Sequence, residues 1–261
     1  MSRLTRRPLR ALLVACAAFA LAAPATASAD NYVALGDSYS SGVGTGSYTL
    51  NSSCMRGVYA YPYLISQQRS GTSLNFVACG GATTTSLMSS QISAVTSSTN
   101  VVTVTIGGND IGFANLIIQC TLGSCNTALN NTRNALPGSL NSKLDTVYSA
   151  IEARAPNATV VVLGYPRLFS SSSCWGTTGI SSSERSDANL LADKLDQTIA
   201  ARAAAYGFTY KSAVSSWTGH AVCSSSAWLN GLNIFATSES YHPNRNGNSQ
   251  GYVPLVRSVI G

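Results

Sequence analysis

The sequence predicts one α/β domain of three layers, α/β/α, with a central, mostly parallel sheet of about five strands. Short β-branched runs alternate with longer amphipathic stretches, which indicates parallel βαβ units. The run 101–106, Val-Val-Thr-Val-Thr-Ile, is apolar or β-branched throughout, as a central strand buried on both faces requires. No internal repeat and no charged linker divides the 261 residues. We therefore expect a single domain.

The strands are expected in chain order, each ending at a turn or loop, at 32–35, 74–78, 101–106, 160–163 and 208–210. Helices are expected between them, the two longest on the helical spacing of their apolar residues, at 59–68, 86–95, 137–155 and 184–206. A last helix is expected at 251–260. The segment 112–134 shows no clear period beyond a helical turn at 115–120.

The first 29 residues have the composition of a secretory signal peptide. Four arginines precede an apolar stretch at 11–23, and Ala27-Ser28-Ala29 is a small-residue cleavage site. The apolar stretch is shorter than the ~18 residues or more expected of a membrane span. We therefore expect cleavage after Ala29, secretion without a stable membrane anchor, and a mature domain of residues 30–261.

The charge balance argues against nucleic acid as a partner. The formal net charge is +6 over the whole sequence, but four of these positive charges belong to the arginines of the leader. The mature protein would carry about +2, which is too little for a strongly basic face. We expect a monomer that binds no nucleic acid.

Six of the seven cysteines follow the leader, at positions 54, 79, 120, 125, 174 and 223. An even number of cysteines in an exported chain indicates disulfide bonds, and six cysteines allow fifteen pairings. No pair has the Cys-x-x-Cys spacing and no histidines cluster nearby. We therefore expect neither a metal site nor a cofactor.

Ser38 stands where the end of a strand would expose a nucleophile. The apolar run 32–35 stops at Gly36, and Ser38 precedes the turn sequence Tyr39-Ser40-Ser41-Gly42. In open α/β sheets, ligands bind at the carboxyl ends of the strands. A Gly-Asp-Ser sequence alone is more often an ordinary polar turn, so this assignment depends on three later blocks.

Those blocks are Ala78-Cys79-Gly80-Gly81-Ala82, Ile106-Gly107-Gly108-Asn109-Asp110 and Ser240-Tyr241-His242-Pro243. We expect them at the ends of the second, third and last strands. Together with Gly36-Asp37-Ser38, they resemble in order the blocks of the GDSL, or SGNH, hydrolase family of esterases and lipases. Within that family the chain resembles the small secreted actinomycete lipases and phospholipases A1. The resemblance covers nearly the whole mature chain and implies the flavodoxin-like fold of the SGNH hydrolases.

The resemblance also implies a role for each matching residue. Ser38 would be the nucleophile and His242 the general base, because a serine hydroxyl needs a base to take its proton. The other histidine, His220, is expected to be structural. Ser38 and Gly81 would donate backbone N–H groups to the oxyanion, and Asn109 its side-chain amide. For Asn109 the alternative is an Asx turn within its own loop.

The group that orients His242 departs from the usual family pattern. An aspartate normally stands three residues before the histidine, and here that residue is Glu239. In the actinomycete lipases a main-chain carbonyl two residues before the histidine takes this role, which corresponds to Ser240. We favour the Ser240 carbonyl, with Glu239 as its rival. For the glycine donor, Gly80 is the rival of Gly81.

The same resemblance implies disulfides in sequence order, Cys54–Cys79, Cys120–Cys125 and Cys174–Cys223. It further implies a secreted hydrolase that cleaves acyl esters of lipids through a Ser38 acyl-enzyme. Two alternatives stay open: a carbohydrate acetyl-esterase using the same site, and a catalytically silent secreted binding protein. Loop residues that would either line an acyl groove or simply pack are Tyr48, Leu50, Tyr59, Tyr165, Phe169 and Trp175.

Overall fold

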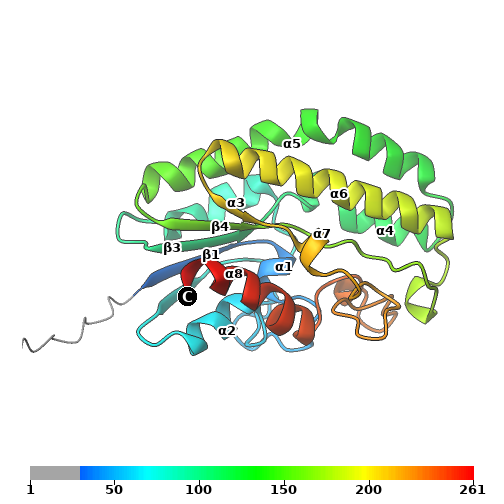
Figure 1. Ribbon diagram of the computed structural model, residues 1–261, viewed down its shortest axis with the longest axis horizontal. Coiled ribbons are helices and arrows are strands. Elements are labelled where there is room, and N and C mark those ends of the chain that lie inside the picture. Colours follow the sequence, from blue (N-terminus) through cyan, green and yellow to red (C-terminus); the bar gives the residue numbers. More distant parts are fainter. Residues whose placement is uncertain (1–29) are drawn as a thin grey trace, which may run out of the picture.

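A single parallel sheet forms the middle layer of the protein (Figure 1). The structure, a computed structural model, describes residues 30–261. The strands are β1 (Asn31–Gly36), β2 (Ser73–Phe76), β3 (Val101–Thr105), β4 (Thr159–Leu163) and β5 (Thr209–Lys211). They lie in the order β2-β1-β3-β4-β5, and every neighbouring pair is parallel. The predicted fold class is confirmed. The predicted signal peptide and its cleavage after Ala29 lie outside the described residues.

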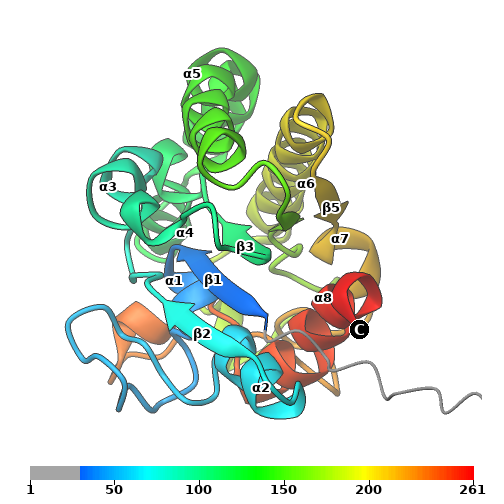
Figure 2. The ribbon, with the colours of Figure 1, turned by 90° about the vertical axis from the view of Figure 1, so that its left-hand side faces the viewer.

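Helices cover both faces of the sheet (Figure 2). One face carries α3 (Thr84–Ser90), α4 (Phe113–Cys120), α5 (Asn126–Arg154) and α6 (Ser182–Ala205), and the other carries α2 (Tyr61–Gln68) and α8 (Val253–Ile260). The helices α1 (Ser38–Ser41) and α7 (Ala213–Ser216) are single turns. Shorter 3₁₀ and π turns are Ile92–Ala94, Asn109–Ile111, Trp175–Thr177, Thr237–Glu239 and Gly247–Tyr252. Among residues 30–261, no helix combines the length and apolar character needed to cross a bilayer.

The central strand β3 is buried at all five positions. A strand covered by helices on both faces has no polar side to present to water, which explains its unbroken β-branched sequence. Its two buried threonines are polar, and one of them, Thr103, shares a hydrogen bond of 2.8 Å with the hydroxyl of Tyr32 in β1. The β-branched sequence predicts this strand correctly because every one of its positions is buried.

Helix α5 begins earlier than predicted. The sequence predicts its start at Pro137, but the helix begins at Asn126 and carries Pro137 in its interior. An internal proline removes one helical hydrogen bond and bends the helix, and α5 bends in its middle (Figure 1). Leu129 and Leu136, on the N-terminal side of the proline, are fully buried. Burial of this face outweighs the cost of the proline.

Two further expectations were wrong. The segment 86–95 is not one helix, because α3 ends at Ser90 and a 3₁₀ turn follows. The block Ser240–Pro243 does not follow the last strand directly: β5 ends at Lys211, and α7 and a long loop intervene. The histidine therefore reaches the sheet edge on a loop, and the sheet itself does not place it.

Three disulfides join the cysteines in sequence order, Cys54–Cys79, Cys120–Cys125 and Cys174–Cys223. The first ties the loop after α1 to the loop that holds Gly81. The second links the end of α4 to the start of α5, and the third joins two loops at the carboxyl ends of the strands.

Candidate active site

The turn between β1 and α1 requires a glycine and places a serine at the edge of the sheet. Gly36 has a φ of +128°, and a Cβ there would lie 2.5 Å from the carbonyl oxygen of Thr105. The Asp37 N–H donates to that same carbonyl at 3.0 Å. The Asp37 carboxylate then caps α1 by accepting from the Tyr39 N–H at 3.0 Å. The chain thus turns sharply at the sheet edge, and Ser38 starts the one-turn helix.

The Ser38 hydroxyl contacts the ring of His242. The distance from Ser38 Oγ to His242 Nε2 is 2.8 Å, and His242 Nδ1 lies 2.9 Å from the carbonyl oxygen of Ser240. A carbonyl oxygen can only accept, so Nδ1 carries the proton and Nε2 is left to accept from Ser38. The carboxylate of Glu239, the rival orienting group, accepts instead from the Tyr48 hydroxyl at 2.5 Å.

Burial keeps the imidazole neutral. It lowers the pKa of His242 from 6.5 to about 4, and the hydrogen bond to the Ser240 carbonyl offsets part of this effect. A neutral imidazole whose Nε2 carries no hydrogen is the form that accepts a proton. The geometry and the charge state are therefore both those of a general base.

Long-range hydrogen bonds hold the loop that carries His242. Tyr241 adopts a φ of +61°, a conformation that side chains other than glycine rarely occupy. The Tyr39 hydroxyl donates to the Tyr241 carbonyl at 2.7 Å. The Asn230 N–H donates to the His242 carbonyl at 2.9 Å, and the Asn230 side chain donates to the Gly44 carbonyl at 2.8 Å. The strained backbone is fixed by partners from distant parts of the chain.

The loop after β2 brings Gly81 close to the same edge of the sheet. Gly81 has a φ of +77° and faces open space. Its N–H makes no hydrogen bond to another group of residues 30–261, whereas the N–H of Gly80 donates to the Cys54 carbonyl at 2.9 Å. The Cys79 N–H donates to the Gly36 carbonyl at 3.0 Å, which ties this loop to the serine turn. Of the two glycines, Gly81 thus has the N–H available to a substrate.

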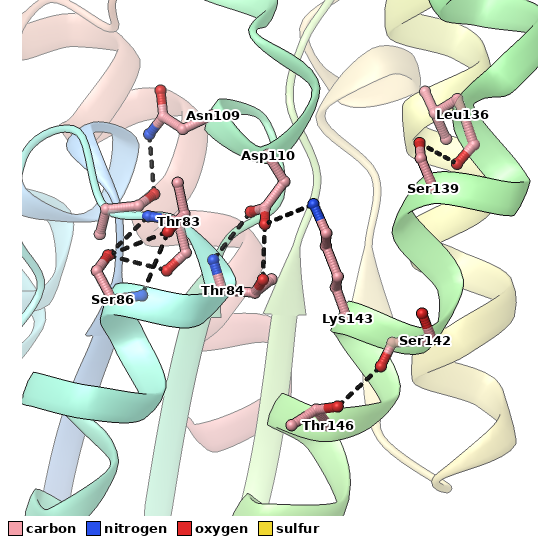
Figure 3. Close-up of polar contacts among 11 residues, drawn as sticks. Thr83, Thr84, Ser86, Asn109, Asp110, Leu136, Ser139, Ser142, Lys143 and Thr146 are labelled. Atoms are coloured by element: carbon pink, nitrogen blue, oxygen red, sulfur yellow. Dashed lines mark hydrogen bonds and ion pairs between the residues drawn. The ribbon is translucent and has the colours of Figure 1, made fainter.

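Asn109 follows β3 and points to the loop after β2 (Figure 3). Its Nδ2 donates to the Ala82 carbonyl at 2.9 Å. An amide nitrogen carries two hydrogens, so the second one remains for a substrate oxygen. The side chain of Asn109 therefore does not form the alternative Asx turn, because the group it bonds lies on another loop.

Asp110 joins the same two loops beside Asn109 (Figure 3). Its carboxylate is buried and accepts from the Thr84 N–H at 2.9 Å and from the Thr84 hydroxyl at 2.6 Å. Lys143 of α5 lies 3.7 Å away. These bonds fix the start of α3 against the end of β3, and so hold Gly81 and Asn109 relative to each other.

A buried network connects three strand ends under the site. Tyr165, after β4, donates its hydroxyl hydrogen to the Asp37 carboxylate and accepts from the Gly108 N–H at 3.0 Å. Burial raises the pKa of Asp37 from 3.8 to about 7, against the lowering effect of the hydrogen bonds from Tyr165 and the Tyr39 N–H. Nothing in the local sequence predicts this role of Tyr165, because its partners follow other strands.

An apolar cavity of about 390 Å³ opens at the Ser38–His242 pair. Its apolar walls come from α1, from α4 and from the loop after β4, and include Tyr39, Phe113, Ile117, Ile118, Tyr165 and Leu168. Of the six loop residues considered from the sequence, Tyr165 lines this cavity, and the other five lie elsewhere in the described part of the chain. The sequence does not predict this contribution of α4, because residues 112–134 show no clear helical period.

His220 is placed far from this chemistry by its contacts. Its ring stacks on Trp228 at 3.6 Å between centroids, and its Nδ1 lies 2.7 Å from the Ser226 carbonyl. These contacts hold one loop together, as a structural histidine would. Within residues 30–261, no three His, Cys, Asp or Glu side chains gather in the way a metal site requires.

Comparison with known proteins identifies the family. The model of the GDSL-like lipase/acylhydrolase family matches residues 34–250. "Lipase 1" of Streptomyces coelicolor is 44% identical over 259 residues, which cover 95% of each chain. The crystal structure of an extracellular lipase from Streptomyces rimosus is 42% identical, with a TM-score of 0.84 over 88% of this chain and 100% of that one. That of phospholipase A1 from Streptomyces albidoflavus NA297 is 41% identical, with a TM-score of 0.84 over 89% and 100%. The chain therefore belongs to the GDSL-like lipase/acylhydrolase family and is an ester hydrolase.

Proposed function

We propose that the protein is a secreted serine hydrolase that cleaves acyl esters of lipids, as a lipase or phospholipase A1. One observation carries the proposal: a serine bonded to a neutral histidine opens into an apolar cavity large enough for part of an acyl chain. The names of the relatives, at 41–44% identity, support the lipid substrate. The three disulfides and the predicted leader support secretion of residues 30–261 as a single domain.

In the proposed mechanism His242 Nε2 takes the proton of Ser38 as Oγ attacks the ester carbonyl carbon. The proton stays on Nδ1 and keeps its hydrogen bond to the Ser240 carbonyl, which favours the ring orientation needed for this transfer. The carbonyl oxygen becomes an oxyanion that accepts from the N–H groups of Ser38 and Gly81 and from Asn109 Nδ2. His242 then gives its proton to the leaving alcohol, and an ester of Ser38 remains.

The second half returns the enzyme to its starting state. Water attacks the acyl-enzyme carbonyl while His242 Nε2 takes the proton of the water. The tetrahedral intermediate collapses, Ser38 Oγ leaves with the proton of His242, and the fatty acid is released. The cavity would hold the acyl chain through both halves of the reaction, because the apolar side chains of Phe113, Ile117 and Leu168 line it.

Product analysis on a phosphatidylcholine with different acyl chains at its two positions tests the proposal. We expect the mature wild-type protein to release the fatty acid of the sn-1 position, and Ser38→Ala to release none. A fluorophosphonate probe should label wild type and leave Ser38→Ala unlabelled. Free choline or phosphatidic acid would contradict acyl chemistry on this substrate. Hydrolysis of acetylated sugars without any long-chain ester would instead support the acetyl-esterase alternative.

A further inference from the structure

Three large apolar side chains are exposed together beside the active site. The exposed fractions are 69% for Trp175, 56% for Ile234 and 95% for Phe235. All three line one shallow groove. They come from two loops that are joined by a hydrogen bond of 3.0 Å from the Leu232 N–H to the Gly176 carbonyl. Exposed apolar side chains that gather in this way mark an interaction site more often than scattered ones do.

The segments that carry this cluster hold no ionised side chain. Residues 168–183 and 212–238 contain no Asp, Glu, Lys or Arg, and are rich in Ser, Thr, Gly and Asn. The nearest carboxylate in the groove, that of Glu239, is bonded to the Tyr48 hydroxyl. The three apolar side chains and the segments that carry them can therefore leave water without the large cost of desolvating a charge.

The groove borders the catalytic loop. Thr237 and Ser238, separated from the exposed pair by Ala236 alone, line the catalytic cavity together with His242. Gly44, on the floor of the groove, lies so close to His242 that a Cβ there would be 2.9 Å from the histidine Cβ. In Figure 1 the orange loop that includes residues 230–240 lies beyond α1, at the end of the molecule toward which β1 runs. A surface that covered the cluster would also face the entrance to the cavity.

We propose that Trp175, Ile234 and Phe235 insert into the surface of a lipid aggregate and hold the catalytic cavity open against it. The occupant is a lipid surface because the cluster is small, apolar and surrounded by uncharged residues, whereas a stable protein partner needs a broader interface with matched polar groups. Tryptophan and phenylalanine are favoured at the boundary between lipid and water. With no ionised group in the cluster, a zwitterionic surface is sufficient. The inference rests on the lipid substrate of the proposed function.

Binding to phosphatidylcholine vesicles tests this inference, with Ser38→Ala as the background so that the lipid stays intact. We expect Ile234→Ser combined with Phe235→Ser to weaken partition at least about tenfold, from the apolar area lost. Leu190→Ser on α6, where the leucine is 46% exposed outside the cluster, is the matched control and should bind as the background does. A several-fold increase in salt concentration should not weaken binding, because no charge pair is involved.

Tryptophan fluorescence locates the contact. Trp217 is buried and Trp228 is half-buried, so the exposed Trp175 should give the change in emission. We expect a blue shift on vesicles and quenching by brominated lipid. Both should be lost in Trp175→Phe, which should still bind. Equal binding by the cluster variants and the Leu190→Ser control would overturn the inference. So would a dimer of the Ser38→Ala background that the cluster variants convert to a monomer.

Hydrolysis separates failure of this inference from failure of the proposed function. With Ser38 present, the cluster variants should hydrolyse a soluble short-chain ester at the wild-type rate and phosphatidylcholine vesicles more slowly. If the wild-type protein hydrolyses the soluble ester but does not bind vesicles, the proposed lipid-binding role of the cluster is overturned and the proposed ester chemistry is not affected. A protein that hydrolyses neither substrate would overturn the proposed function itself, whatever its binding.

Discussion

The two sides of the candidate active site are positioned by different physical means. Ser38 and Asn109 follow adjacent strands, β1 and β3, whose register pairs Gly36 with Thr105. His242 instead stands on a loop that is far along the chain from the last strand. A ladder of backbone hydrogen bonds fixes the first side. Backbone hydrogen bonds pair the second side with the loop at 228–230, but side chains, among them Tyr39, Asn230 and Tyr48, connect it to the loops around Ser38.

This difference has a consequence for mutations. A typical hydrogen bond contributes about 0.5–1.5 kcal/mol net, so a small number of modest contributions holds the histidine loop against the serine turn. The strand ends share the stability of the whole sheet. We therefore expect single polar side chains to affect positioning more on the histidine side. On the strand side, the largest effects should come from groups that touch the substrate.

The largest effect is expected for Asn109→Ala. The variant removes the proposed amide donor to the oxyanion, and loss of one such donor typically lowers kcat by about 10²–10³. KM on a soluble ester should change little, because the donor acts on charge that develops in the transition state. Asn157→Ala, at an exposed turn before β4, is the control and should retain wild-type kcat. A kcat within threefold of wild type, roughly 0.6 kcal/mol, would reduce Asn109 to a loop-bonding role.

The pH dependence of kcat/KM tests the burial of the histidine side. Burial lowers the pKa of His242 to about 4, and the neutral ring is the proposed base. Activity should thus be full above this value and should fall as the pH drops through it. The midpoint of the acidic limb should lie near pH 4 and not near 6.5. Circular dichroism over the same range checks that the protein stays folded. A midpoint near 6.5 would mean that water reaches the imidazole freely.

Asp110→Asn tests the link between the two oxyanion loops. The two oxygens of the carboxylate each accept one hydrogen bond from Thr84. An asparagine side chain in the same position has only one oxygen and can therefore replace only one acceptor atom. We expect roughly a tenfold loss in kcat from the displaced donors, with unchanged KM. The free energy of unfolding should fall by about 1–3 kcal/mol. Lys143→Met, which removes the partly exposed partner, should cost at most about 1 kcal/mol. Equal effects of the two variants would argue against the link.

A matched pair of tyrosine variants compares the two sides directly. Tyr39→Phe removes the donor to the Tyr241 carbonyl, next to His242. Tyr165→Phe removes the donor to Asp37 and the acceptor of Gly108, on the strand side. We expect Tyr39→Phe to lower kcat roughly three- to tenfold, about 1 kcal/mol, and Tyr165→Phe to lower kcat less. If Tyr165→Phe lowers kcat more, the contrast between the two sides does not hold.

The smallest effect is expected for Glu239→Gln. The carboxylate accepts from Tyr48, and the proposed orienting group of His242 is the Ser240 carbonyl, so the amide should serve almost as well. A kcat within about twofold of wild type, or roughly 0.4 kcal/mol, is expected from steady-state kinetics. Were Glu239 the orienting carboxylate, the loss would approach the ~10⁴ seen when the aspartate of a Ser-His-Asp triad becomes asparagine. Tyr48→Phe should behave as Glu239→Gln does.

Local pattern was sufficient for the sheet and for the side of the site that it carries. The run 101–106 predicts a buried central strand, and the glycine after 32–35 predicts a turn at a strand end. Each statement depends on neighbours in sequence. The start of α5 was not predictable in this way, because a proline is typical of the first turn of a helix, and only the burial of Leu129 and Leu136 explains why the helix begins before Pro137.

The sequence by itself determined the fold class, the strand ends that carry Ser38 and Asn109, and the supply of one histidine near the carboxyl terminus. The tertiary structure decided which acceptor meets His242, which helix lines the cavity and where the exposed aromatic loops lie. The physical reason is the range of the forces involved. Periodicity and turn chemistry act between neighbours in sequence, whereas the bond from Tyr39 to the Tyr241 carbonyl exists only once the whole chain has folded.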